Sequence, residues 1–219
     1  MVDSVQYQTY DTKRMMKNAA LIITDIQNDF LPGGALAVSN GDEIIPLVNR
    51  LQELFPLVVA TQDWHPVGHK SFASAHPGKN VFDRILLEGA DQILWPDHCV
   101  QGSAGAALAS ALSTDAVEAI FRKGMDIFID SYSCFYDNEW KKSTGLADYL
   151  RGRHIQTVYL VGLAGDFCVG FSAMDALSEG FETFVIEDAT RSISETGYIE
   201  MEKMIRSKGG KIIQSDEFF

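Results

Sequence analysis

Residues 159–172 read Tyr159-Leu-Val-Gly-Leu-Ala-Gly-Asp-Phe-Cys168-Val-Gly-Phe-Ser172, an apolar run that passes into a helical pattern. The apolar run is typical of a strand buried on both faces of a sheet. Cys168 therefore lies where a strand gives way to a helix. The free N–H groups and the positive dipole end of a helix N-terminus favour a thiolate, and the same N–H groups can hold an oxyanion. A buried structural thiol is the ordinary alternative for a free cysteine.

The same alternation of strand and helix recurs along the chain. Short runs rich in Val, Ile and Leu predict strands over residues 19–24, 57–61, 116–122, 157–162, 183–187 and 211–214. Helical patterns are found over residues 42–54, 104–112, 146–151, 168–179 and 194–207. This rhythm predicts an α/β fold with a parallel sheet covered by helices on both faces. Residues 63–103 break the rhythm, and long loops in compact domains are usually functional or disordered.

The composition is that of one globular domain with an acidic surface. A chain of 219 residues, 46% hydrophobic, is long enough for one continuous core. The net charge of −12 argues against nucleic acid and anionic membranes as partners, because both need a basic face. Three widely spaced cysteines indicate a reducing compartment, and we expect a cytoplasmic location. We expect residues 1–18 to be an N-terminal extension and residues 19–219 to form the domain.

Chemically active side chains follow four of the predicted strands. Asp25 follows the first strand and Asp63 the second. Lys123 follows the third, and Cys168 comes just beyond the fourth. Because ligands bind beyond the carboxyl ends of parallel strands, one pocket can receive all four side chains. Taken singly, Asp25 also fits a turn or helix N-cap, and Lys123 fits a solvated loop lysine.

A second group of residues has the spacing of a metal site. In extended chain the side chains of Asp63 and His65 point the same way and can share one ion. His98 is the best distant third ligand, and His69 and His76 are the alternatives. Two imidazoles and one carboxylate suit Zn, but also Fe or Mn with waters. A lone Asp-x-His pair is often only a turn hydrogen bond.

Five segments, in order, resemble the nicotinamidase branch of the isochorismatase-like cysteine hydrolases: Asp25-Ile-Gln-Asn-Asp-Phe30, Asp63-Trp-His-Pro66, Trp95-Pro-Asp-His-Cys-Val100, Lys123-Gly124 and Gly162-Leu-Ala-Gly-Asp-Phe-Cys168-Val169. The resemblance runs from about residue 19 to near the C-terminus. It implies a three-layer α/β/α domain with a six-stranded, mainly parallel sheet. By position, it implies a catalytic triad of Asp25, Lys123 and Cys168. It places the metal ligands at Asp63, His65 and His98.

The resemblance also implies the reaction, which is hydrolysis of nicotinamide to nicotinate and ammonia through a thioester. The cofactor implied is one divalent metal ion, Zn, with Fe or Mn as alternatives. Backbone N–H groups of Ala164 and Cys168 would form the oxyanion hole, after a cis peptide bond between Leu163 and Ala164. Phe30 and Trp95 match residues that flank the substrate ring. Family members often self-associate, so a homo-oligomer is expected.

Two rival functions remain open from the sequence. The nearer rival is an amidase for a different small carboxamide, such as pyrazinamide. The more distant rival is a non-catalytic binding module on the same fold. Two positions also depart from the family pattern: Gly165 stands where Thr is common, and Phe167 where Tyr or His is frequent.

Overall fold

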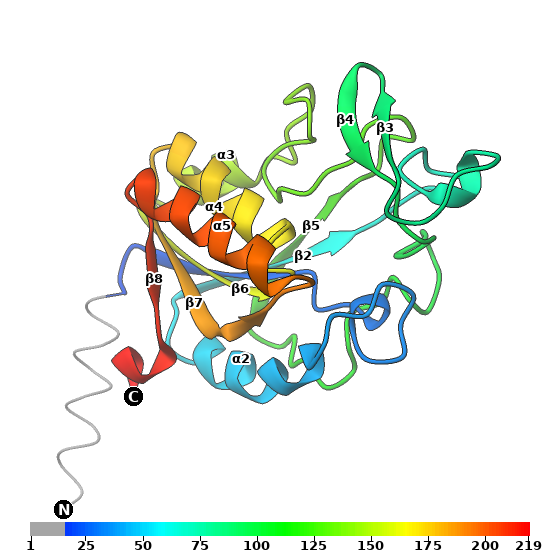
Figure 1. Cartoon of the computed structure of the whole chain (residues 1–219). Coiled ribbons are helices and arrows are strands. Elements are labelled where there is room, and N and C mark those ends of the chain that lie inside the picture. Colours follow the sequence, from blue (N-terminus) through cyan, green and yellow to red (C-terminus); the bar gives the residue numbers. More distant parts are fainter. Residues whose placement is uncertain (1–15) are drawn as a thin grey trace, which may run out of the picture.

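The computed structural model describes residues 16–219, and its centre is a six-stranded sheet in which every neighbouring pair is parallel (Figure 1). The strands are β1 (Ala19–Thr24), β2 (Leu57–Asp63), β5 (Val117–Lys123), β6 (Thr157–Leu163), β7 (Glu182–Arg191) and β8 (Lys211–Ile213). Their order across the sheet is β5-β2-β1-β6-β7-β8. The predicted parallel α/β sheet is confirmed.

Burial along each strand follows its place in the sheet. Every residue of β1 is buried, because this apolar strand has a neighbour on each side and helices above and below it. β5 lies at one edge, and its residues alternate between exposed and half-buried until Lys123 at its end, which is buried. The edge strand β5 therefore places one buried charged side chain, that of Lys123, at the carboxyl end of the sheet.

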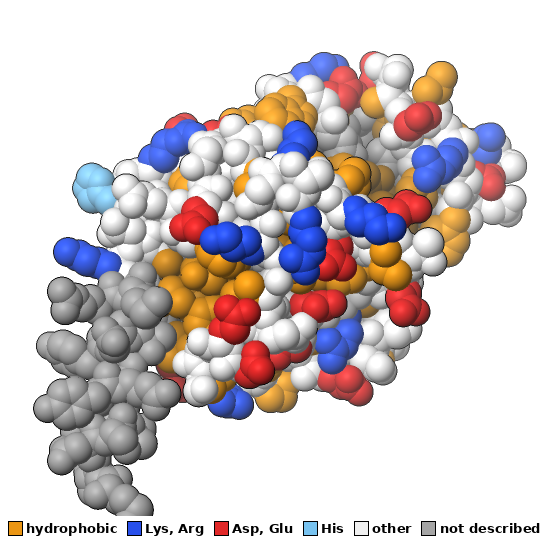
Figure 2. Space-filling view, turned by 60° about the vertical axis from the view of Figure 1, so that its left-hand side comes forward, with side chains coloured by type: hydrophobic (Ala, Val, Ile, Leu, Met, Phe, Trp, Pro, Cys, Tyr) orange, Lys and Arg blue, Asp and Glu red, His pale blue; other side chains and the backbone are white. Residues whose placement is uncertain are grey.

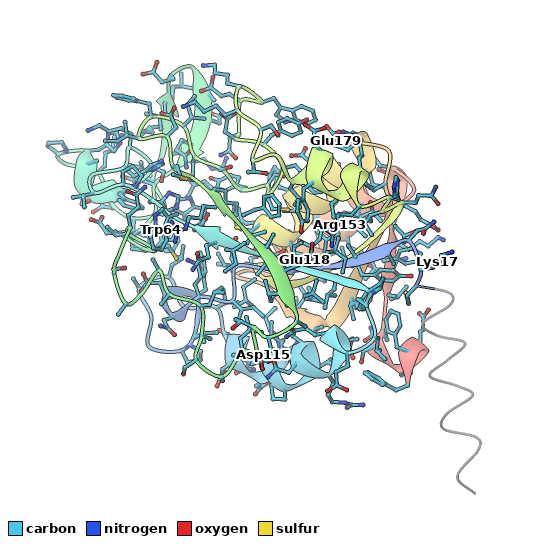
Figure 3. The ribbon with its side chains drawn as sticks, turned by 180° about the vertical axis from the view of Figure 1, so that it is seen from behind. Lys17, Trp64, Asp115, Glu118, Arg153 and Glu179 are labelled. Carbon is cyan, nitrogen blue, oxygen red and sulfur yellow. The ribbon has the colours of Figure 1, made fainter. Side chains whose placement is uncertain are left out.

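Helices cover both faces of the sheet, as the three-layer prediction requires (Figure 1). The helices are α2 (Ile45–Gln52), α3 (Leu146–Gly152), α4 (Cys168–Ser178) and α5 (Glu195–Ser207). Short 3-10 helices are η1 (Asn28–Phe30), η2 (Gly41–Ile44), η3 (Ala73–Ala75) and η4 (Ser215–Phe218). One apolar cluster lies under α2 and a second lies under α3, α4 and α5. At the edge of the sheet, Arg153 after α3 forms an ion pair with Glu118 of β5 (Figure 3).

The helix predicted over residues 104–112 is wrong, because the segment forms turns. Its backbone bonds to a distant segment: the N–H groups of Asn28 and Asp29 donate to the carbonyls of Ala107 and Gly105, at 3.0 Å each. These carbonyls are directed at residues 28–29 and not along a helix axis. Tertiary hydrogen bonds have overridden the local helical preference of small residues.

The helix predicted over residues 42–54 is shorter than expected. It begins as the 3-10 helix η2 and becomes α-helical only from Ile45, with Pro46 in the first turn of α2. Residues 63–103 contain an antiparallel hairpin that the sequence did not reveal, β3 (Arg84–Leu87) and β4 (Ala90–Ile93). Its turn residues Glu88 and Gly89 both have positive φ.

The first described residues lead directly into the sheet. Met16 is buried in the apolar cluster on the α2 side, so the domain begins slightly before residue 19. Most of the predicted N-terminal extension, residues 1–15, lies outside the described residues. Over the face shown in Figure 2, acidic and basic side chains are interspersed. Among residues 16–219, no helix is long and apolar enough to cross a membrane.

Candidate active site

The carboxyl ends of β1, β2 and β5 meet the N-terminus of α4 at one place. Asp63 and Lys123, the last residues of β2 and β5, are partners in the parallel ladder. Thr24 at the end of β1 pairs with Gly162 of β6. Asp25, which follows β1, therefore lies beside the chain that leaves β6 for α4. The sheet register itself brings together side chains that are far apart in sequence.

Lys123 is the centre of this cluster. Its Nζ lies 3.0 Å from Oδ2 of Asp25, 2.5 Å from Oδ1 of Asp63 and 3.3 Å from Sγ of Cys168. It also donates to the carbonyl oxygen of Ser131, at 2.9 Å. All five residues are buried. The structure thus places the three predicted triad residues in one another's reach, with one carboxylate more than the triad needs.

Burial dominates the protonation of these groups. It raises the pKa of the Cys168 thiol well above its ordinary value, and it raises the pKa of the Asp25 carboxyl, with Lys123 acting against both shifts. Burial opposes the charge on Lys123, but Asp25 and Asp63 outweigh it and raise the pKa of this amine. The buried site therefore favours the ammonium form of Lys123 and the thiol form of Cys168. Desolvation thus acts against the thiolate that a helix N-terminus favours.

Thr61 fixes the orientation of the Asp25 carboxylate. The Thr61 hydroxyl donates to Oδ1 of Asp25 at 2.5 Å and accepts from the Asp25 backbone N–H at 3.2 Å. Asp25 has a φ of 49°, in the left-handed region that few residues other than glycine enter. With Oδ1 held by Thr61, Oδ2 faces Lys123. The sequence analysis missed Thr61, whose only signal was a hydroxyl inside an apolar strand.

Asp63, His65 and His98 converge beside the lysine. Oδ2 of Asp63 lies 3.8 Å from Nε2 of each histidine. Nδ1 of His65 faces the carbonyl oxygen of Gly124 at 2.9 Å, and Nδ1 of His98 faces that of Pro96 at 2.8 Å. Because a carbonyl oxygen only accepts, each Nδ1 carries a proton, and in the neutral ring Nε2, on the side of the carboxylate, is the nitrogen that can bind a cation. Three donors that converge in this way fit a divalent cation.

The alternative third ligands are engaged elsewhere. Nδ1 of His69 lies 2.7 Å from the Ser71 hydroxyl, and its Nε2 lies 2.6 Å from the carbonyl oxygen of Asp126. Nε2 of His76 faces the carbonyl oxygen of Lys70 at 2.8 Å. Both rings are therefore held by hydrogen bonds, His76 within its own loop and His69 also to the loop after β5. Of the three candidates, the geometry favours His98.

The turn between β6 and α4 presents two free N–H groups. The peptide bond between Leu163 and Ala164 is cis, as the family resemblance implied. Gly165 and Val169 donate backbone hydrogen bonds at 2.8 and 3.0 Å. Among the described residues, the N–H groups of Ala164 and Cys168 have no such acceptor. These two groups are the ones expected to hold an oxyanion.

The two departures from the family pattern have structural counterparts. A Cβ on Gly165 would lie 2.6 Å from Oγ of Ser192 and 2.8 Å from the Tyr198 ring, so this chain has no room for the usual Thr. The Phe167 ring packs edge-on against Trp95, with centroids 4.9 Å apart. Phe167 thus extends the aromatic wall of the pocket.

The pocket at Cys168 is narrow and largely apolar. It is lined by Phe30, Leu36, Asp63, Trp95, His98, Asp130, Tyr132, Ala164, Phe167, Cys168 and Ile193. Phe30 and Trp95 lie in this wall, where the resemblance had placed them. Its free volume is about 20 Å³, enough for about one water molecule. We therefore expect lining side chains to shift when a ring binds.

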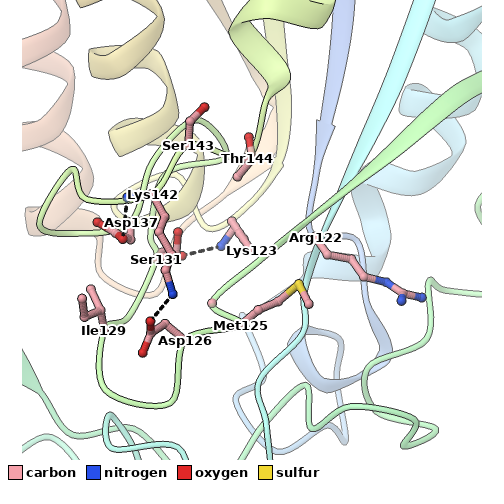
Figure 4. A pocket seen from close by; sticks show the side chains of 11 residues that line it. Arg122, Lys123, Met125, Asp126, Ile129, Ser131, Asp137, Lys142, Ser143 and Thr144 are labelled. Carbon is pink, nitrogen blue, oxygen red and sulfur yellow. Dashed lines mark hydrogen bonds and ion pairs between the residues drawn. The ribbon is translucent and has the colours of Figure 1, made fainter.

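A second cavity of about 200 Å³ lies beside Lys123 (Figure 4). It is open to solvent, its lining mixes charged, hydroxyl and apolar side chains, and two of the lining residues, Lys142 and Asp126, form an ion pair. The bond from Lys123 to the carbonyl oxygen of Ser131 is seen from this side in Figure 4. Lys123 therefore lines this cavity while its amine contacts Cys168 in the narrow pocket.

Besides Thr61, three polar residues of the site were missed by sequence reasoning. The Asp130 carboxylate lies within 4.8 Å of ring nitrogens of His65 and His69 and also lines the pocket. The Gln92 amide donates to Oδ2 of Asp130 at 3.1 Å and to the Tyr132 hydroxyl at 3.2 Å. No local pattern marks these residues, because their roles arise from contacts between distant loops.

Comparison with known proteins agrees with this geometry. The family described as Isochorismatase domain matches residues 19–217. A nicotinamidase of Acinetobacter baylyi is 49% identical over 187 residues, which cover 85% of this chain and 87% of that protein. The crystal structure of a nicotinamidase and pyrazinamidase of Acinetobacter baumanii has 46% identity and a TM-score of 0.90, and the match covers 92% of this chain and 98% of that one.

A more distant structure adds a metal. The pyrazinamidase of Pyrococcus horikoshii, determined in complex with zinc, is 38% identical with a TM-score of 0.74, over 90% of this chain and 99% of that one. The sheet order, the buried cysteine at the start of α4 and the family match over residues 19–217 agree with one another. The chain therefore belongs to the isochorismatase family of hydrolases.

Proposed function

We propose that the chain hydrolyses nicotinamide to nicotinate and ammonia. The single observation that carries this function is the contact of Lys123 Nζ with Asp25, Asp63 and Cys168 at the base of an aromatic pocket. A nucleophile, a proton acceptor and a flat apolar wall are the parts that amide hydrolysis on a planar ring requires. The 49% identity to a nicotinamidase supports the same substrate.

In this proposal Cys168 is the nucleophile and Asp25 the general base. Asp25 takes the thiol proton as sulfur adds to the amide carbon, and its raised pKa makes it a better acceptor than a solvated carboxylate. The proton passes to the leaving nitrogen, the C–N bond breaks, and ammonia leaves a thioester on Cys168. Asp25 then takes a proton from water, and the water oxygen attacks the thioester carbon. The C–S bond breaks, nicotinic acid leaves and ionises to nicotinate, and Asp25 returns its proton to the Cys168 sulfur. Lys123 keeps the carboxylate and the sulfur in contact throughout.

The N–H groups of Ala164 and Cys168 are proposed to stabilise the tetrahedral oxyanion. Both are free of backbone acceptors, and both lie on the turn that carries the nucleophile. In well-studied hydrolases, loss of one such donor costs about 3–4 kcal/mol of transition-state stabilisation. Two donors held by one turn would therefore account for a large part of the expected rate enhancement.

Asp63, His65 and His98 are proposed to hold one divalent metal ion. The donor set fits zinc, and the zinc complex of the pyrazinamidase of Pyrococcus horikoshii supports that choice over iron or manganese. When bound, the ion supplies a Lewis-acidic centre beside the ring pocket. Asp63 also contacts Lys123, so this carboxylate joins the metal site to the catalytic cluster.

Two further properties belong to the proposal. Cys99, Cys134 and Cys168 are all free and buried, which supports a reducing, cytoplasmic location. Self-association into a homo-oligomer, implied by the family resemblance, is tested by analytical ultracentrifugation. A single species at the mass of one chain at micromolar concentration would contradict it.

Ammonia release from nicotinamide tests the function. The wild-type chain should release ammonia, and Cys168→Ala should reduce the rate at least a thousandfold because no other described thiol faces the pocket. Cys134→Ala is the matched control, since Cys134 is also free and buried but packs in the core beneath α4. Pyrazinamide, assayed in parallel, defines the range of amides.

The rival functions give different outcomes in the same assay. A wild-type rate in Cys168→Ala would refute the mechanism. Nicotinamide binding by calorimetry without ammonia release by the wild type would instead indicate a binding module. Turnover of another carboxamide, but not of nicotinamide, would indicate a related amidase.

A further inference from the structure

We propose that Gln92 is a positioning residue for the substrate pocket, and that it acts through Asp130 and Tyr132. Gln92 lies on the β3–β4 hairpin, outside the central sheet (Figure 1). The inference rests on the proposed function, because it concerns how the pocket holds the ring of the same substrate.

Gln92 differs from the other residues of the β3–β4 hairpin in its burial. Among the eight residues of β3 and β4, Gln92 is the only buried one, with 4% of its surface exposed. A hairpin that is attached only by packing would bury an apolar side chain at this position. Burial of an amide is unfavourable unless its hydrogen bonds are satisfied, so the contacts of Gln92 decide what it does.

Two of the three contacts of the Gln92 amide lead to the pocket wall, and the third is to the backbone of the next residue. Nε2 of Gln92 lies 3.1 Å from Oδ2 of Asp130, 3.2 Å from the Tyr132 hydroxyl and 2.7 Å from the carbonyl oxygen of Ile93. The Tyr132 hydroxyl also accepts from Nε1 of Trp95, at 3.3 Å. One amide thus sets the position of the pocket's second carboxylate and of two aromatic rings.

The rings in question form the apolar wall of the pocket. Tyr132 meets Trp95 edge-on with centroids 6.2 Å apart, and Phe167 packs edge-on against both. Without the Gln92 amide, the Tyr132 hydroxyl loses one partner and the buried Asp130 carboxylate keeps on its side chain only the backbone N–H of Ser131. Both side chains are then free to turn away from the position that a ring requires.

The nucleophilic cluster is supported from the other side. The carbonyl oxygen of Ser131 accepts from Lys123, and the Ser131 hydroxyl donates to the carbonyl oxygen of Tyr136 at 2.9 Å. Thr61 and Asp63 hold the remaining members without help from the hairpin. Loss of Gln92 should therefore weaken binding of the substrate more than the chemical step.

The test compares Gln92→Leu and Gln92→Asn with wild type, using nicotinamide. Leu keeps the volume of the side chain but removes the amide, and Asn keeps the amide but shortens the side chain by one methylene. If one variant does not fold, the other still gives the measurement. Gln214→Leu is the matched control, because Gln214 also donates to a carboxylate, that of Glu187, but at the surface. We expect KM to rise at least tenfold and kcat to stay within threefold in the Gln92 variants only.

Hydrogen exchange measured by mass spectrometry gives a readout that does not need turnover. In Gln92→Leu, amides of residues 130–132 should exchange faster, and those of α5 should not. Unchanged KM and unchanged exchange would overturn the inference. A lower thermal midpoint with unchanged KM would overturn it too, because it would reduce Gln92 to a structural role. Absence of turnover by wild type would refute the proposed function instead, and exchange would still decide the role of Gln92.

Discussion

Replacing Gly165 by Ala tests how tightly the oxyanion turn is packed against α5. The new Cβ would lie 2.6 Å from Oγ of Ser192 and 2.8 and 2.9 Å from two atoms of the Tyr198 ring. Favourable carbon contacts lie at about 3.5–4.0 Å, so the turn or the ring must move by roughly 1 Å. Overpacking of this kind costs about 1–3 kcal/mol. We expect the upper part of this range, because three close contacts arise at once.

Tyr198 provides the means to relieve the clash. The Tyr198 hydroxyl is buried, and it has no hydrogen-bond partner among the described residues. Tyr198→Leu therefore removes the ring without orphaning another polar group. In a double-mutant cycle, Gly165→Ala should lower the free energy of unfolding less in the Tyr198→Leu background than in wild type, with a coupling free energy of about 1–2 kcal/mol.

Urea unfolding measures the stability part of this prediction, and kcat measures the catalytic part. The turn carries Ala164 and Cys168, so Gly165→Ala should lower kcat about tenfold, and the double variant should recover most of it. Additive unfolding free energies, or a Gly165→Ala protein within about 0.5 kcal/mol of wild type, would show that the turn is loosely packed. The explanation for the missing Thr would then be wrong.

Three further predictions concern charge, metal and pH. Lys123→Met should reduce ammonia release at least a hundredfold, because two buried carboxylates lose their counter-ion; a rate within tenfold of wild type would contradict this. His98→Ala should hold less than half the metal of wild type by elemental analysis, and equal metal content would remove His98 from the ligand set. Burial raises the pKa of the Asp175 carboxyl to about 6, so the folded protein binds this proton more tightly than the unfolded chain does. The contribution of this proton to the free energy of unfolding is lost as pH rises through 6. In urea unfolding, Asp175→Asn should be more stable than wild type by about 1–2 kcal/mol at pH 7.5, with the gap closing towards pH 4, and an equal gap at both pH values would contradict this.

The strands and the triad were predictable for a common reason. A strand buried on both faces is typically a short apolar run, and the change to polar residues after it marks its carboxyl end. The edge strand β5 differs, because Glu118 and Arg122 lie within it and only its apolar positions mark the strand. Asp25, Lys123 and Cys168 could therefore be placed at one edge of the sheet without knowledge of the contacts. Predicted strand ends were early at β2, β5, β6 and β7. Asp63, Lys123 and Leu163 continue the ladder where the apolar run gives way to charged residues or glycine, and β7 continues to Arg191 after a shift in its register with β6.

Other parts of the structure depend on contacts that no local pattern shows. The segment over residues 104–112 has a helical composition, but its carbonyl of Ala106 accepts from the Gln27 amide, at 2.8 Å. Gln27 also binds the backbone of Asp63 through both ends of its amide, so it fastens three segments together. Thr61 and Gln92 were missed for the same reason. Their partners lie 36 or more residues away, and polarity alone does not identify such a partner.

Access to the sulfur follows from the exposure of the pocket's own wall. Cys168 is buried at the base, and the residues around it are buried except for Ile193, which is 38% exposed, and the half-buried Tyr132 and Phe167. A pyridine ring must therefore pass between these three side chains. Asp166 ties the two sides of this opening together, because its carboxylate accepts the N–H of Ile193 at 3.0 Å within the turn that carries the nucleophile. Ile193 and the turn that carries Ala164 and Cys168 are thus joined by a hydrogen bond, so we expect displacement of Ile193 by a ring to shift the backbone that is proposed to hold the oxyanion.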